Sequence, residues 1–256
     1  MKVAVLMENT KCDPDLTCEH GLSLYIEANG IRILFDTGQT GAFAKNGEKL
    51  GIDLPDVDFC VLSHGHYDHG GGLSRFLKIN EKAKIYASPY AFDQHYHGKE
   101  KNIGLDQSLP RERFVFVSGK RELAPGIVID PCGERTENAG DQGMYVVENG
   151  RWEPETFRHE QYLLITEGQK RYLFSGCSHR GAAHIAAWFR PDVFIGGFHL
   201  SKVEDEPALL AAAQALAKLD TIYYTGHCTG QRQYESLKTV LGQRLRALST
   251  GMVLTL

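Results

Sequence analysis

The segment HGHYDH at residues 64–69 gathers side chains that could bind a metal ion. Four of its six residues carry an imidazole or a carboxylate: His64, His66, Asp68 and His69. Three glycines follow directly, and glycine lets the backbone turn tightly, so we expect the four side chains to converge. Neutral imidazole and carboxylate are ligands of zinc, iron and manganese. The alternative is a solvated polar loop, in which so many ligand groups would have little structural use.

Regular elements must position this segment. It follows an apolar run, DFCVLS at 58–63, that predicts a buried strand. Further strands are predicted at 2–7, 22–28, 31–35, 84–88, 162–166, 171–175, 192–196, 221–225 and 252–256, and a weak strand pair at 113–118 and 127–130. Helices are predicted at 41–50, 72–79, 181–189, 207–219 and 231–241. Strand pairs come first and strand–helix alternation comes later in both halves, which favours two packed sheets with helices outside.

Two long polar segments, 89–112 and 131–157, show little periodicity apart from an apolar run at 144–147. Loops of this length inside a compact domain are uncommon and usually functional. We therefore predict that both segments form walls or a lid of the active site.

The overall composition limits the classes of function. Hydrophobic residues make up 42% of the chain and charged residues 23%, which is typical of a globular protein. The net charge of −4, without a basic stripe, argues against nucleic-acid binding. No apolar stretch approaches the roughly 20 residues of a membrane span, and the N-terminus lacks a secretory pattern. We expect a cytoplasmic protein with a small-molecule substrate, and the sequence does not specify an oligomeric state.

With these features the chain resembles the metallo-β-lactamase superfamily. The resemblance is carried by FDTG at 35–38, HGHYDH at 64–69, LFSGCSH at 173–179 and TGHCTG at 225–230. The runs EHGLSLYIE at 19–27 and GGFHL at 196–200 are similar to the branch of dihydropterin-ribofuranosylaminobenzene 5′-phosphate synthase-like proteins. The resemblance implies one domain over residues 1–256 with an α+β fold, an αββα four-layer sandwich of two packed mixed sheets with helices outside. It also implies one or two divalent metal ions at the edge between the sheets, zinc in preference to iron or manganese.

By this resemblance, His64 and His66 bind the first metal ion. Its third ligand is either His159, which lies before a predicted strand pair where relatives often place this histidine, or His179, which lies two residues past Cys177 within the match to the branch motif. We favour His179, because a loop at the end of a strand carries it beside Cys177.

The second metal ion, by the same resemblance, is bound by Asp68, His69 and His227. Many relatives have an aspartate that bridges both metals at the strand end where this chain has Cys177. A thiolate is a softer ligand, which either binds a metal directly, favouring zinc or iron, or leaves one site weak. The alternative is that Cys177 is only a small buried residue.

Five residues are predicted to have supporting roles. Asp68 would orient, or accept a proton from, a hydroxide formed from metal-bound water. Asp36 would accept a hydrogen bond from a ligand histidine, or else only start a turn. His199 would face the substrate and protonate the leaving group, and His20 is a weaker candidate of the same kind; both could instead be loop histidines. Arg180 is expected at the surface, with contact to a substrate phosphate as the alternative.

The sequence thus predicts a metal-dependent hydrolase that uses a metal-bound hydroxide on a small pterin- or aminobenzene-like substrate, with or without a phosphate. The branch resemblance also allows a synthase or transferase. A different class remains open: an iron-binding redox or metal-sensing protein without hydrolytic activity, because Cys177 and Cys228 lie beside proposed ligands. A nuclease is disfavoured by the acidic balance.

Overall fold

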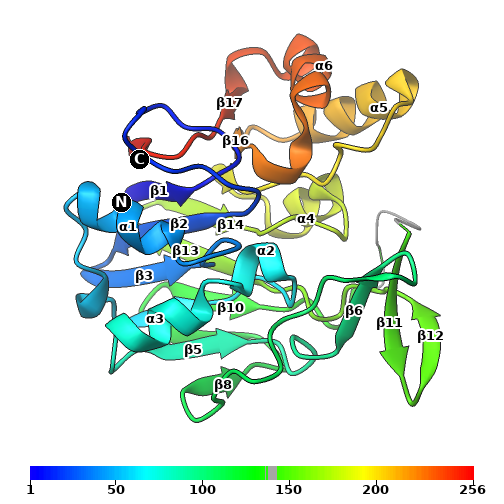
Figure 1. The fold of residues 1–256 in the computed structure, drawn as a ribbon. Coiled ribbons are helices and arrows are strands. Elements are labelled where there is room, and N and C mark those ends of the chain that lie inside the picture. Colours follow the sequence, from blue (N-terminus) through cyan, green and yellow to red (C-terminus); the bar gives the residue numbers. More distant parts are fainter. Residues whose placement is uncertain (136, 138–142) are drawn as a thin grey trace.

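A computed structural model describes residues 1–135, 137 and 143–256 of the chain, and two seven-stranded sheets form its centre (Figure 1). The first sheet has the order β18 (Val253–Thr255), β1 (Lys2–Met7), β2 (Ser23–Ala28), β3 (Ile31–Phe35), β4 (Phe59–Val61), β5 (Lys84–Ala87) and β8 (Phe114–Phe116). The second has the order β17 (Leu245–Ala247), β16 (Ile222–Thr225), β15 (Val193–Ile195), β14 (Lys170–Phe174), β13 (Tyr162–Glu167), β10 (Ile127–Asp130) and β9 (Arg121–Ala124).

Six α-helices and three short 3₁₀-helices complete the described structure. The α-helices are α1 (Ala42–Lys49), α2 (Tyr67–Gly70), α3 (Leu73–Ile79), α4 (Ala182–Phe189), α5 (Glu206–Ala217) and α6 (Gln231–Leu241). The 3₁₀-helices are η1 (Leu54–Asp56), η2 (His227–Thr229) and η3 (Gly242–Arg244). α5 shows how the sequence fixes such a helix: the Asp205 carboxylate caps its first turn by accepting from Ala208 N–H, and Leu209, Ala213 and Leu216 are buried.

Three buried apolar clusters define the layers. One joins the facing sides of the two sheets, for example Val5 and Phe35 of the first with Ile165 and Phe174 of the second. A second cluster packs the other side of the first sheet against α1 and α3. A third packs the other side of the second sheet against α4, α5 and α6. The chain therefore has the predicted αββα sandwich of two mixed sheets, and Figure 1 shows the two groups of helices outside them.

Local sequence explains the hairpin between β2 and β3. Asn29 and Gly30 have φ angles of 50° and 76°, the two positive values that a two-residue hairpin turn of type I′ needs. The turn sets the register that pairs Ala28 with Ile31.

Parallel pairing explains why distant motifs meet. β3, β4 and β5 run parallel in the first sheet, and β14 to β17 run parallel in the second. Loops that follow parallel strands leave the sheet at the same edge, where ligands of such sheets bind. The loops after β3, β4, β14, β15 and β16 carry FDTG, HGHYDH, GCSH, GGFHL and GHCTG respectively.

A four-stranded third sheet departs from the sequence prediction. β6 (Gln94–His97), β7 (Lys101–Asn102), β11 (Met144–Glu148) and β12 (Arg151–Pro154) make it, in the order β12-β11-β6-β7. Of these strands, the sequence indicates only the apolar run at 144–147. The others are polar and partly or wholly exposed, so apolar and polar residues do not alternate along them.

The strands at 113–118 and 127–130 do not pair with each other, so that prediction is wrong. β8 joins β5 in parallel in the first sheet, whereas β10 forms a hairpin with β9 and also pairs with β13 in the second. The two apolar runs are close in sequence, which favoured a hairpin between them. The more polar run at Arg121–Ala124 instead forms the hairpin with β10.

Among the helices of the described residues, none is long and apolar enough to cross a lipid bilayer.

Candidate metal centre

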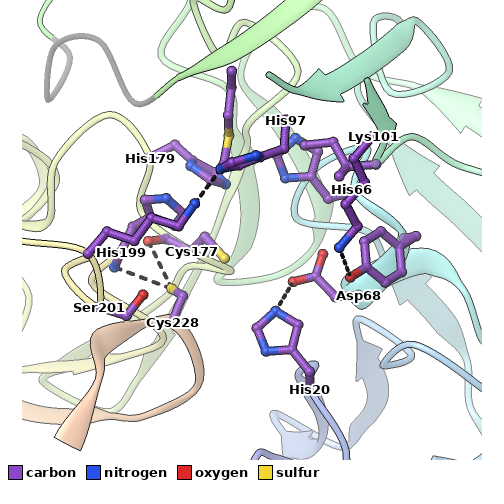
Figure 2. A pocket seen from close by; sticks show the side chains of 14 residues that line it. His20, His66, Asp68, His97, Lys101, Cys177, His179, His199, Ser201 and Cys228 are labelled. Atoms are coloured by element: carbon purple, nitrogen blue, oxygen red, sulfur yellow. Dashed lines mark hydrogen bonds and ion pairs between the residues drawn. The ribbon is translucent and has the colours of Figure 1, made fainter. Parts of the chain in front are cut away.

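A cavity of about 220 Å³ opens where the strand-end loops of both sheets meet (Figure 2). The third sheet supplies a further wall through His97, Lys101 and Met144. The remaining lining residues are His20, His66, Tyr67, Asp68, Ile103, Cys177, His179, His199, Ser201, Lys202 and Cys228. Both polar segments, 89–112 and 131–157, thus contribute to the walls, and their residues 136 and 138–142 lie outside the described part of the chain.

The first group of ligand-type side chains is His64, His66 and His179. One ring nitrogen of each lies within 4.8 Å of the other two, and all three residues are buried. Burial lowers the pKa of each imidazole well below its usual value, and neighbouring imidazoles add to this effect. All three rings are therefore neutral near pH 7, which is the state that binds metal.

The second group is Asp68, His69, Cys177 and His227. His69 Nε2 lies 3.1 Å from His227 Nε2, 3.2 Å from Cys177 Sγ and 3.7 Å from Asp68 Oδ2. His227 Nε2 is 3.2 Å from Asp68 Oδ2. Ligands at 2.0–2.3 Å around a tetrahedral ion lie roughly 3.3–3.8 Å apart. The four atoms are thus spaced much as the ligands of one such ion would be.

Asp36 and Ser63 fix the protonation of two of these imidazoles. Asp36 Oδ2 accepts from Ser63 Oγ at 2.6 Å and from His69 Nδ1 at 2.7 Å, and Oδ1 accepts from Ser63 N–H. Because the Ser63 hydroxyl donates to Asp36, its oxygen accepts from His64 Nδ1, 2.8 Å away. Both rings therefore carry their proton on Nδ1 and present an unprotonated Nε2. Asp36 makes the contact with a candidate ligand that the sequence predicted.

Asn9 does the same for His227, and the sequence analysis missed it. Its Oδ1 lies 3.0 Å from His227 Nδ1 and 3.3 Å from Gly21 N–H, so this oxygen accepts from both. Its Nδ2 then faces His20 Nδ1 at 3.3 Å and donates there, which leaves His20 with a proton on Nε2. His20 Nε2 is 3.3 Å from Asp68 Oδ2, as Figure 2 shows. One amide thus sets opposite tautomers in two histidines.

These tautomers leave the second group rich in acceptors. The lone pairs of His69 Nε2 and His227 Nε2 converge with a carboxylate oxygen and a sulfur in a buried place. Burial raises the pKa of Asp68, but His69, His20 and His227 outweigh it and hold that pKa well below its usual value. A buried cluster of acceptors is stable only with a cation among them, either a proton or a metal ion. The donor set fits a divalent metal ion.

His159 lies next to this centre but is oriented differently from the other candidates. Its Nδ1 accepts from Gly65 N–H at 2.9 Å, so its proton sits on Nε2 and no lone pair remains for a metal. The ring stacks on His95 at 4.0 Å between centroids, and His95 Nδ1 pairs with buried Glu155 at 2.6 Å. His66, His95 and His159 form a further group of ligand-type atoms within 4.8 Å of one another, as His64, His66 and His179 do. No spacing in the sequence had pointed to the His95–Glu155 pair.

His199, proposed to protonate a leaving group, lines the cavity, and its ring lies 4.2 Å from that of His179. Its Nδ1 is buried and has no hydrogen-bond partner among the residues that the structure describes. Its backbone N–H donates to Cys228 Sγ at 3.2 Å, and Cys177, His199 and Cys228 form a further group of ligand-type atoms within 4.8 Å. Both thiols that motivated the redox alternative therefore line the cavity.

Arg180 is neither at the surface nor in the metal cavity. Its guanidinium is buried and donates to the carbonyl oxygens of Pro131 and Cys132, and it lies over the Trp188 ring. The prediction of a surface position is wrong, because the side chain is needed to hold the segment at 131–132 against α4.

The glycines after HGHYDH serve close packing and not a tight turn. Gly71 and Gly72 have helical φ angles of −64° and −80°. A Cβ on Gly71 would lie 2.1 Å from Gln39 O, and one on Gly72 would lie 2.3 Å from Thr37 O. The absence of side chains lets the loop after β3 approach the metal segment closely enough for Asp36 to reach His69.

Comparison with known proteins agrees with this geometry. The family model described as the metallo-beta-lactamase superfamily matches residues 16–227. The 7,8-dihydropterin-6-methyl-4-(beta-D-ribofuranosyl)-aminobenzene-5′-phosphate synthase of Methanocaldococcus jannaschii is 30% identical over an alignment of 264 positions that covers 92% of this chain and 90% of that protein.

Solved structures show the same fold. A crystal structure of a metal-dependent hydrolase of the beta-lactamase superfamily is 30% identical with a TM-score of 0.85, covering 100% of this chain and 99% of that one. Zinc-bound PqqB from Methylobacterium extorquens, 12% identical with a TM-score of 0.58, covers 100% of both chains and shares the fold.

Proposed function

Because the chain belongs to the metallo-beta-lactamase superfamily, we propose that it is a metal-dependent enzyme of hydrolase type. Its substrate would be a small molecule that combines a phosphate with an aromatic, pterin- or aminobenzene-like group. The size of the cavity, about 220 Å³, supports a small substrate over a polymer. The name of the Methanocaldococcus jannaschii relative supports the chemical class, and it also keeps a synthase reaction open.

One observation carries this proposal: the convergence of acceptor atoms from Asp68, His69, Cys177 and His227, with Nδ1 of both imidazoles already committed to acceptors. The first group, His64, His66 and His179, would hold another ion beside this one. When bound, the divalent cations supply Lewis acidity, which activates water for attack and polarises the attacked carbonyl or phosphoryl group.

The side chains around these groups would handle the protons. Asp68 would accept the proton released by the attacking water at its carboxylate. His20 contacts Asp68 Oδ2 and is exposed, so it would connect that carboxylate with solvent. His199 lines the cavity, and its imidazole would donate a proton to the leaving group there.

The test compares metal content and turnover in the same preparations. His66→Ala and His69→Ala should each lose metal and turnover of phosphate monoesters, diesters and pyrophosphates, while the fold survives on its apolar core. His184→Ala is the matched control, because His184 is an exposed histidine on α4 outside the cavity. If His66→Ala kept the wild-type metal content and turnover, the proposal would be wrong.

A second candidate function is an iron-binding redox or metal-sensing protein. The observation in its favour is that Cys177 and Cys228 both line the cavity, within reach of the same ligand group as His199. Thiolates favour iron as well as zinc. Metal analysis and an absorbance spectrum separate the two, because a coloured iron protein without turnover supports this candidate and a colourless zinc protein with turnover supports the hydrolase.

A further inference from the structure

We propose that the metal cavity and a neighbouring apolar cavity form one bipartite binding site for an aromatic phosphate, with the phosphate held by Lys101 and Lys202 and the ring in the apolar cavity. This inference rests on the proposed function, and it assigns the two halves of the substrate to residues outside the metal-ligand groups.

Two ammonium groups without acidic partners carry the first half of the inference. Lys101 Nζ donates to Tyr67 Oη at 3.3 Å, and Lys202 Nζ contacts His97 Nε2. Among the residues that the structure describes, neither ammonium lies within 4.0 Å of a carboxylate. Asp68 is the only acidic residue that lines the cavity in the described chain. Two uncompensated positive charges at one cavity favour an anion.

His97 lies in the positive electrostatic field of the same two lysines. Burial lowers the pKa of its imidazole, and the charges of Lys202 and Lys101 lower it further. A neutral His97 can accept from Lys202 at Nε2, which orients the ammonium beside the cavity. In Figure 2, His97 and Lys101 lie above Cys177 and Cys228, and both lysines line the same cavity as these two cysteines.

The apolar cavity carries the second half. It has a volume of about 420 Å³ and is lined by Ala183, Phe198, Leu200, Val203, Ala212 and Leu216, among others. No acidic or basic side chain except Lys202 lines it within the described residues, apart from the imidazole of His199. A dry cavity of roughly 150 Å³ can hold benzene, so this one has room for a bicyclic ring.

Two residues connect the cavities. His199 and Lys202 line both, so a ligand with its anion on Lys202 can place an attached ring directly into the apolar cavity. His199 then lies at the junction of phosphate and ring, beside the bond between them. The shared walls place His199 and Lys202 between the two cavities.

The test measures equilibrium binding by calorimetry on the zinc-loaded protein, with methylphosphonate and (1-naphthylmethyl)phosphonate as probes because the C–P bond resists hydrolysis. We expect the naphthyl probe to bind at least about tenfold more tightly, as burial of an aromatic ring predicts. Lys202→Met should weaken both probes about tenfold, and Lys101→Met should act in the same direction.

Variants that fill the apolar cavity test binding of the ring separately from binding of the phosphate. Ala212→Phe should abolish the advantage of the naphthyl probe and leave methylphosphonate binding unchanged, and Ala183→Leu offers the same test from α4. Ala211→Phe is the matched control, because Ala211 is exposed on the same helix and lines neither cavity.

Equal affinity for the two probes, or unchanged binding of methylphosphonate in both lysine variants, overturns the inference. Zinc content is measured on the same samples. Absence of zinc would instead overturn the proposed function, so the two failures are distinguishable.

Discussion

Replacing Asp36 by asparagine should disable the group of Asp68, His69, Cys177 and His227 without changing the shape of the side chain. Asp36 is fully buried and accepts three hydrogen bonds, two from Ser63 and one from His69 Nδ1. An asparagine offers one oxygen and one NH₂ group. If the oxygen keeps the backbone N–H of Ser63, the NH₂ group points at His69 Nδ1, and two donors then face each other.

The imidazole of His69 escapes this clash by moving its proton to Nε2, the atom that faces the other three candidate ligands. We expect the affinity of this group for zinc to fall about 10- to 100-fold, the usual cost of losing a carboxylate behind a ligand histidine. Loss of one buried hydrogen bond to a charged group should also lower the free energy of unfolding by about 1.5–3 kcal/mol. The group of His64, His66 and His179 should lose less affinity, because Ser63 can still accept from His64.

Competition with a chromophoric chelator gives the two zinc affinities, and the nitrogen shifts of labelled histidine give the tautomer of His69. Asp58→Asn is the matched control, because Asp58 is exposed and accepts a backbone N–H of Arg32 away from the cavity. Two zinc ions bound with wild-type affinity in Asp36→Asn, together with an unchanged His69 tautomer, would contradict this reasoning.

Three further changes have defined outcomes. Cys177→Ser should weaken zinc binding at the second group more than at the first, and Cys177→Asp should restore zinc binding through an oxygen ligand. Zinc affinity is measured under reducing conditions. Unchanged affinity in the serine variant would show that Cys177 is only a packing residue. Glu155→Gln should lower the free energy of unfolding by about 3 kcal/mol near pH 7. Burial raises the pKa of Glu155, but its bond to His95 outweighs burial and lowers that pKa, so the contribution of Glu155 exists above its unfolded pKa and disappears as acid protonates the folded state. Denaturant unfolding of wild type and variant should therefore converge as the pH falls from the unfolded pKa of Glu155 through its lower folded pKa, and a gap that did not shrink on acidification would count against the ion pair. Gly71→Ala should destabilise the fold by about 1–3 kcal/mol through its clash with Gln39 O, whereas Gly119→Ala, with open space around it, should not; equal melting temperatures would exclude the clash.

Local patterns predicted the parts of this molecule that local physics determines. The apolar strands, the Asn29-Gly30 turn and the helices have periodicities or turn residues that act over a few positions. The resemblance through HGHYDH and GHCTG predicted which side chains gather at the sheet edge. They meet there because the loops after parallel strands leave a sheet at the same edge.

Contacts that depend on long-range pairing could not be read in the same way. Asn9 and His227 are 218 positions apart, and nothing near either residue indicates that they touch. The His95–Glu155 pair depends on the third sheet, whose polar strands carry no burial pattern. For the same reason the sequence alone left His159 and His179 as alternatives: the hydrogen bond from Gly65 N–H to His159 Nδ1 joins residues 94 positions apart.

A crystal structure of the purified protein, with anomalous diffraction recorded at the absorption edges of zinc, iron and manganese, examines the metal centre most directly. We predict an anomalous peak between Asp68 Oδ2, His69 Nε2, His227 Nε2 and Cys177 Sγ, with a metal–sulfur distance of about 2.3 Å if the ion is zinc. A protein that carries stoichiometric metal but shows no anomalous density among these four atoms would contradict the assignment of this cluster as a metal centre.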